Sequence, residues 1–112
     1  MIEKNFFYDE FSDRLMISCK KQDDKISGST RILNVTLDFT TDNKIVNIEI
    51  RNVSDYISSL SLNADILKNL SDAELICTQY KDGYVIYFIL KSKQGNIERI
   101  PFNLPMSNLI NA

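Results

Sequence analysis

The sequence of 112 residues contains no histidine. Histidine is the commonest general base in enzymes and the commonest metal ligand, so its absence excludes histidine-based catalytic triads, His–Asp dyads and zinc sites that use histidine. The chain also lacks a glycine-rich phosphate-binding loop, a recognisable spacing of metal ligands and a nucleophile beside an activating base. We therefore expect a protein that is not an enzyme and that needs no metal or other cofactor.

Cysteine, net charge and long apolar segments are also scarce. The two cysteines, Cys19 and Cys77, are too few for a disulfide scaffold, and we interpret them as small core residues, although their pairing stays open. A net charge of -2 indicates no broad basic surface, so we expect no nucleic-acid partner. The longest apolar run, Tyr84–Leu90, is far shorter than the roughly 18 residues of a spanning helix, and residues 1–10 lack the pattern of a signal peptide. We expect a soluble, cytoplasmic protein that does not contact a membrane.

The remaining composition is that of an ordinary globular protein. Hydrophobic residues make up 44% and charged residues 25% of the chain, which argues against disorder. A chain of 112 residues is short for two hydrophobic cores, so we predict one domain over residues 1–112. Within this domain, residues 1–58 form a half made of β-hairpins, and residues 59–112 form a half with a short helix and a β-meander.

Alternating apolar and polar residues predict strands throughout the first half. The predicted strands cover Phe6–Tyr8, Leu15–Cys19, Leu33–Phe39 and Val46–Ile50. The polar segment Lys21–Ser29 predicts a loop, and the turn after Phe39 contains Asn43, a residue type that tolerates a positive φ. We therefore expect the last two of these strands to form an antiparallel hairpin.

The hydrophobic pattern changes its period in the second half. Asn63 is a good helix N-cap and predicts a short helix over Ala64–Leu70, while the serine-rich segment Ser54–Ser61 is compatible with one further turn. Three more strands are predicted over Leu75–Tyr80, Tyr84–Leu90 and Ile97–Phe102, with Lys81, Asp82 and Gly83 in the first hairpin turn. The predicted fold is α+β and β-rich, with antiparallel hairpins, a three-stranded meander and one short helix.

A series of short motifs between residues 8 and 54 follows the pattern of one protein family. In order, these motifs are a Tyr–Asp pair, an acidic turn, a Leu–x–Ile strand, a Val/Leu strand into an Asp-bearing turn, and an Ile–Glu–Ile strand before a small-residue helix start. The matching residues are Tyr8, Asp9, Asp13, Leu15, Ile17, Val35, Leu37, Asp38, Asp42, Lys44, Ile45, Val46, Ile48, Glu49, Ile50, Asn52 and Ser54. This segment resembles domain-of-unknown-function family 2283.

The resemblance implies a compact β-rich fold and no established activity, and it provides no catalytic residue to transfer. Some proteins of this kind are encoded beside toxin-like genes, so the resemblance also suggests an antitoxin function by analogy. It covers a little under half of the chain, and residues from about 60 onward lie outside it.

The predicted strand Tyr84–Leu90 is apolar on both faces, unlike a strand that has one face in water. One face presents its even-numbered residues, and the other presents Val85, Tyr87 and Ile89. We therefore expect both faces to be covered, either inside the fold or by a second subunit. Because one short helix cannot cover a sheet of up to seven strands, we predict a homodimer with Val85, Tyr87 and Ile89 as interface residues.

Two groups of carboxylates are alternative candidates for a site. Asp9, Glu10 and Asp13 form an acidic turn with the oxygen ligands that a hard cation prefers, although a solvated turn explains the same residues. Asp38 and Glu49 are expected on the solvent face of one hairpin, where acid–base chemistry would require one of them to be buried. We prefer a solvated surface as the interpretation of both groups.

These observations favour a small non-catalytic protein-interaction module that self-associates and binds a heterologous protein. The first alternative is an antitoxin-like regulator that binds and blocks a partner protein. The second is a β domain that binds a small ligand or a metal ion through Asp9, Asp13 or Asp38.

Overall fold

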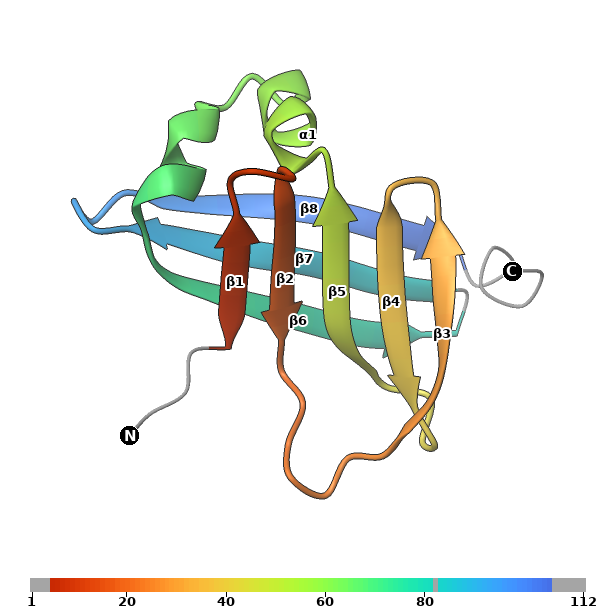
Figure 1. Cartoon of the computed structure of the whole chain (residues 1–112). Helices are drawn as coiled ribbons and strands as arrows, with labels where there is room; N and C mark the ends of the chain where they lie inside the picture. Colours follow the sequence, from red (N-terminus) through yellow and green to blue (C-terminus); the bar gives the residue numbers. More distant parts are fainter. Residues whose placement is uncertain (1–4, 82, 106–112) are drawn as a thin grey trace.

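A computed structural model describes residues 5–81 and 83–105 and contains two antiparallel β-sheets that pack against each other (Figure 1). The five-stranded sheet has the order β1-β2-β5-β4-β3, with β1 (Phe6–Asp9), β2 (Arg14–Ser18), β3 (Ile26–Ile32), β4 (Val35–Thr40) and β5 (Ile45–Arg51). The three-stranded sheet has the order β6-β7-β8, with β6 (Leu70–Tyr80), β7 (Gly83–Ser92) and β8 (Ile97–Pro105). The predicted β-rich α+β fold is confirmed.

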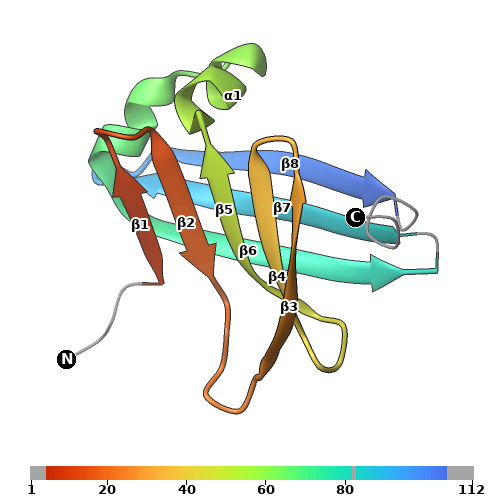
Figure 2. The ribbon, with the colours of Figure 1, turned by 45° about the vertical axis from the view of Figure 1, so that its right-hand side comes forward.

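The inner faces of the two sheets share one hydrophobic core. Alternate residues of β2, β4 and β5 point into it from one side, and alternate residues of β6 and β7 point into it from the other. Leu37 in β4 and Phe88 in β7 are both 0% exposed. The strands of the two sheets cross steeply rather than running side by side, as Figures 1 and 2 show. Because each inner face packs against the other sheet, each sheet has an outer face that is turned away from the core.

The turn between β4 and β5 has the predicted hairpin geometry. Asn43 has a φ of 62°, which is the positive value expected from the sequence. Thr40 is 1% exposed, and its Oγ1 accepts hydrogen bonds from the backbone N–H groups of Asp42 at 3.3 Å and Lys44 at 3.1 Å. The turn therefore satisfies its own polar groups while the two strands pair.

The predicted loop over Lys21–Ser29 is wrong in its last residues, because β3 begins at Ile26 and pairs with β4. β3 is an edge strand in which no residue is fully buried, so neither face imposes an alternating pattern on its sequence. A β-bulge between Ile26 and Gly28 further disturbs the period. The hydroxyl of Ser27 donates to the carbonyl oxygen of Thr40 at 3.0 Å, so side-chain hydrogen bonding accompanies the backbone ladder here.

An α-helix, α1 (Val53–Ser59), occupies the serine-rich segment after β5 and lies at one end of the sandwich (Figure 2). It buries Val53 and Ile57. Asn52, which precedes the helix, has a φ of 53°, and its side chain makes no capping hydrogen bond. The first turn of α1 must therefore be capped from elsewhere in the chain.

The helix predicted over Ala64–Leu70 is a 3-10 helix, η1 (Ala64–Asn69), and Leu70 already belongs to β6. Asn63 acts as its N-cap, as predicted, and accepts a hydrogen bond from the backbone N–H of Asp65 at 2.9 Å. In the part of the chain that the structure describes, no helix is long and apolar enough to cross a bilayer.

The three-stranded sheet is the predicted meander. β6 begins at Leu70 rather than at Leu75, and Leu70 lies opposite Ser92 of β7. At the other end of this hairpin Tyr80 pairs with Gly83, whereas Asp82 of the predicted turn lies outside the described residues. The length of β6 and β7 gives this sheet a large outer face.

Replacing Phe88 with alanine tests the shared core. Phe88→Ala removes a fully buried ring between the sheets, so the free energy of unfolding should fall by about 3–5 kcal/mol. Val85 lies on the opposite face of the same strand and is 39% exposed, so Val85→Ala should lower it by less than about 1 kcal/mol. Urea denaturation followed by circular dichroism measures both changes, and equal losses would contradict the assignment of the two faces.

Candidate functional site

The outer face of the three-stranded sheet contains the three residues predicted to form an interface. Val85, Tyr87 and Ile89 alternate along β7 with buried core residues and point away from the core. Alternate residues of β6 and β8 extend this surface on both sides. This outer face consists of Asp72, Glu74, Ile76, Thr78 and Tyr80 from β6, Val85, Tyr87, Ile89 and Lys91 from β7, and Ile97, Arg99 and Pro101 from β8.

The centre of the outer face is apolar and only partly covered. Val85 is 39% exposed, and Tyr87 and Ile89 are half-buried. Some of this cover comes from the same sheet, because the guanidinium carbon of Arg99 lies 4.9 Å from the centre of the Tyr87 ring. The chain itself therefore covers the inner face of β7 completely and leaves its outer face partly exposed in a single copy.

Opposite charges flank the apolar centre on the two sides of β7. The strand register places Glu74 of β6 and Arg99 of β8 in one row with Ile89 between them. Neighbouring strands lie about 4.8 Å apart, so Glu74 and Arg99 are separated by roughly 10 Å and are too far apart for a direct ion pair. Among the residues that the structure describes, neither of them takes part in an ion pair. Each copy of the face thus has an acidic side and a basic side.

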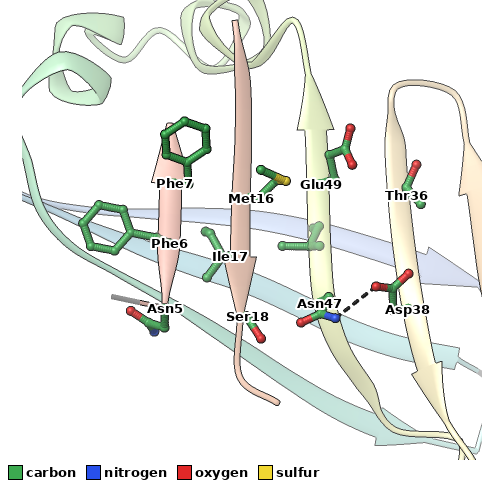
Figure 3. Close-up of a pocket in the computed structure, with 11 residues that line it drawn as sticks. Asn5, Phe6, Phe7, Met16, Ile17, Ser18, Thr36, Asp38, Asn47 and Glu49 are labelled. Atoms are coloured by element: carbon green, nitrogen blue, oxygen red, sulfur yellow. Dashed lines mark hydrogen bonds between the residues drawn. The ribbon is translucent and has the colours of Figure 1, made fainter. Parts of the chain in front are cut away.

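A cavity of about 340 Å³ opens on the outer face of the five-stranded sheet (Figure 3). Phe7 and Met16 pair across β1 and β2, are 57% and 37% exposed, and form its apolar part. Asp38 lies in its polar part and accepts hydrogen bonds from Ser29 Oγ at 2.6 Å and from Asn47 Nδ2 at 3.0 Å. The Asp38 carboxylate is therefore held by its own neighbours.

Glu49 lies on the same outer face as Asp38, as the sequence predicts, and points to the side of the sheet where Figure 3 places the cavity. Its Oε1 lies 3.3 Å from Arg14 Nη1 and 3.6 Å from Arg51 Nε. The guanidinium groups of two arginines therefore flank this carboxylate oxygen. Among the described residues this buried oxygen accepts no hydrogen bond and has only the two arginine charges beside it, whereas the Asp38 carboxylate accepts two hydrogen bonds.

The acidic turn between β1 and β2 is stabilised by local hydrogen bonds. Asp9 accepts hydrogen bonds from Ser12 Oγ at 2.7 Å and from the N–H of Phe11 at 3.1 Å, and the bond from Ser12 lowers the pKa of Asp9. Glu10 forms an ion pair with Lys68 at 3.5 Å. Within residues 5–81 and 83–105, no group of three or more cysteine and carboxylate side chains is placed to hold a metal ion.

Asp13 caps the first turn of α1. Its carboxylate accepts hydrogen bonds from Ser54 Oγ, from the N–H of Ser54 at 3.2 Å and from the hydroxyl of Tyr8 at 2.9 Å, and its carbonyl oxygen accepts one from the N–H of Val53 at 3.2 Å. These bonds supply the cap that Asn52 does not provide. Sequence reasoning missed this role because Asp13 and Ser54 are 41 positions apart, and no local pattern connects them.

Comparison with known proteins gives a match for the first half of the chain. The model of a family described as "Protein of unknown function (DUF2283)" matches residues 5–54. This segment includes the whole five-stranded sheet and the contact between Asp13 and Ser54, whereas the three-stranded sheet lies outside it. No curated protein and no solved structure gives a significant match to the chain.

The contact with Asp13 should keep Tyr8 protonated in alkaline solution. Burial, followed by the hydrogen bond and charge of Asp13, raises the pKa of Tyr8 from 10.0 to about 12. Because this pKa is higher in the folded than in the unfolded chain, the contribution to stability is complete below pH 10 and is lost as the pH rises towards about 12.

Ultraviolet absorbance of tyrosinate as a function of pH measures this titration. The tyrosine that ionises last should be missing in Tyr8→Phe and should ionise at lower pH in Asp13→Asn. Wild-type and Asp13→Asn curves that coincide would show that Asp13 does not control this pKa.

Proposed function

The first half of the chain, residues 5–54, belongs to the DUF2283 family of unknown function. We propose that the protein is a non-catalytic interaction module that self-associates through the outer face of the three-stranded sheet. The supporting observation is the apolar centre of that face, where Val85 is exposed and Tyr87 and Ile89 are only half-buried in a single chain. A contiguous apolar patch with polar residues at its rim is typical of a protein interface. The two hydrogen bonds that hold Asp38 and the two arginines that flank Glu49 support the non-catalytic part of the proposal.

A second copy of the chain complements this face in charge. In a dimer with the outer faces packed together and the twofold axis parallel to β7, β6 of one copy lies over β8 of the other. Because Glu74 and Arg99 share one register row, Glu74 of each copy then faces the partner's Arg99. Two reciprocal ion pairs flank the axis, and the apolar side chains of β7 meet their own counterparts along it. Lys91 also lies near the axis, so the Lys91 side chains of the two copies approach each other. Asp72, which pairs with Lys91 across β6 and β7, reduces the repulsion between these two charges.

The size of the face favours a reversible dimer. β7 has 10 residues, so at about 3.3 Å per residue and about 4.8 Å between strands the face measures roughly 30 by 15 Å. This corresponds to on the order of 500 Å² per copy, which is smaller than the about 800 Å² of a standard interface. We therefore expect the dimer to dissociate on dilution.

Tyr87→Asp tests the proposed surface by placing a carboxylate at its centre. In a dimer this charge would be buried against its own counterpart, so Tyr87→Asp should keep a mass near 12.9 kDa at concentrations where the wild-type mass approaches twice that value. Size exclusion with light scattering measures the masses.

Phe7→Asp is the matched control, because it removes an aromatic ring that is 57% exposed on the other sheet. This variant should dimerise like the wild type. Thermal unfolding followed by circular dichroism establishes that each variant is folded, and a folded Tyr87→Asp variant that still dimerises would refute the proposed surface.

Reversing two charges tests the twofold arrangement. Glu74→Arg alone and Arg99→Glu alone place like charges opposite each other, so each should raise the dimer Kd by about tenfold or more. The double variant restores opposite charges and should recover most of the affinity, which sedimentation velocity at several concentrations measures. A double variant as weak as the single variants would contradict this arrangement, whereas self-association itself is tested by Tyr87→Asp.

A further inference from the structure

Two cysteines from different sheets line one cavity. Cys19 follows the last residue of β2, which ends away from α1 in Figure 1, and Cys77 lies on the inner side of β6. Both thiols are free, and both line a cavity of about 400 Å³ that is formed by residues of both sheets. The fold thus brings together two residues that are far apart in the sequence.

The backbone of Ile45, at the start of β5, lies beside both thiols. The thiol of Cys19 donates to the carbonyl oxygen of Ile45 at 3.7 Å, and the N–H of Cys19 donates to the carbonyl oxygen of Val46 at 2.7 Å. Burial and then the neighbouring Cys19 raise the pKa of Cys77 to about 11, while a backbone hydrogen bond from Ile45 lowers it. The backbone of Ile45 therefore lies beside Cys19 Sγ on the wall of the cavity that both cysteines line.

The two thiols differ in their access to solvent. Cys19 is exposed, whereas Cys77 is half-buried against the core. Lys21, Asp24 and Lys44 line the same cavity, and Asp24 and Lys44 form an ion pair at 3.0 Å. Burial and Asp24 raise the pKa of Cys19, and the two lysines lower it. An oxidant from solvent therefore reaches Cys19 first.

We propose that Cys19 and Cys77 form an intramolecular disulfide that joins the two sheets when the protein is exposed to a peroxide. The sulfur of Cys19 attacks one oxygen of hydrogen peroxide, which gives a sulfenic acid and releases the other oxygen as water. The sulfur of Cys77 then attacks the sulfur of Cys19 and displaces the hydroxyl group as a second water molecule. The two thiols lose two electrons and their two hydrogens, and the peroxide is reduced.

This disulfide would connect β2 to β6 and close a loop that contains β3, β4, β5, α1 and η1. A cross-link over a long loop restricts the unfolded chain, so the oxidised protein should be harder to unfold than the reduced protein. The bond would also hold the two sheets together at the cavity.

Wild-type protein treated with a small excess of hydrogen peroxide at mildly alkaline pH tests the proposal. We expect an intact mass lower by two hydrogens, a peptide that links Cys19 to Cys77 after digestion, and a midpoint of thermal unfolding higher by at least about 5 °C. Dithiothreitol should reverse all three changes. The variants Cys19→Ser and Cys77→Ser, treated in the same way, should show none of them.

Two results would overturn the proposal. One is oxidation of Cys19 to a sulfinic acid with Cys77 left as a thiol, and the other is a disulfide between two chains through Cys19. The outer face of the three-stranded sheet contains neither cysteine, so this experiment and the test of self-association can fail separately.

Discussion

The contact between the inner faces of the two sheets is the interaction on which the rest of the structure depends. It buries Leu37 and Ile48 from one sheet and Ile86 and Phe88 from the other to 0–1% exposure. Burial of apolar surface, at about 25 cal/mol per Å², is the main favourable contribution to folding. The segment that matches the family supplies only the five-stranded sheet, whose inner face would lie in water without the three-stranded sheet. The second half of the chain therefore provides the cover that the first half needs.

The outer face of β7 differs from an ordinary solvent-facing strand because its central residues are apolar. β7 is apolar on both sides, but the five-stranded sheet covers only one of them. The helical segments α1 and η1 lie at one end of the sandwich in Figure 1 and leave this outer face to solvent. Tyr87 is partly covered by Arg99, while Glu74 on the opposite side has no ion pair among the described residues. A second copy related by a twofold axis would bury the apolar centre and pair both Glu74 and Arg99 with opposite charges.

Local sequence patterns predict those parts of this fold whose conformation is determined by residues of the same strand or turn. The alternation in β4 and β5, Asn43 in the turn between them and Asn63 at the start of η1 are of this kind, and so are the two faces of β7. The edge strand β3 could not be predicted, because its exposed residues carry no alternation. The start of α1 and the pairing of β2 with β5 depend on contacts between distant segments, of which the bonds from Asp13 to Ser54 are the clearest example. The cavity that Cys19 and Cys77 both line could not be predicted for the same reason, because it forms only when the two sheets pack together.

The mass of the unmodified protein in solution tests self-association most directly. Light scattering after size exclusion measures it over a range of loading concentrations. We predict a mass that rises from 12.9 kDa towards twice this value as the concentration increases, because the outer faces of the three-stranded sheets of two copies pack together. A mass of 12.9 kDa at every concentration would contradict the proposal and would show that the apolar outer face of β7 stays in water.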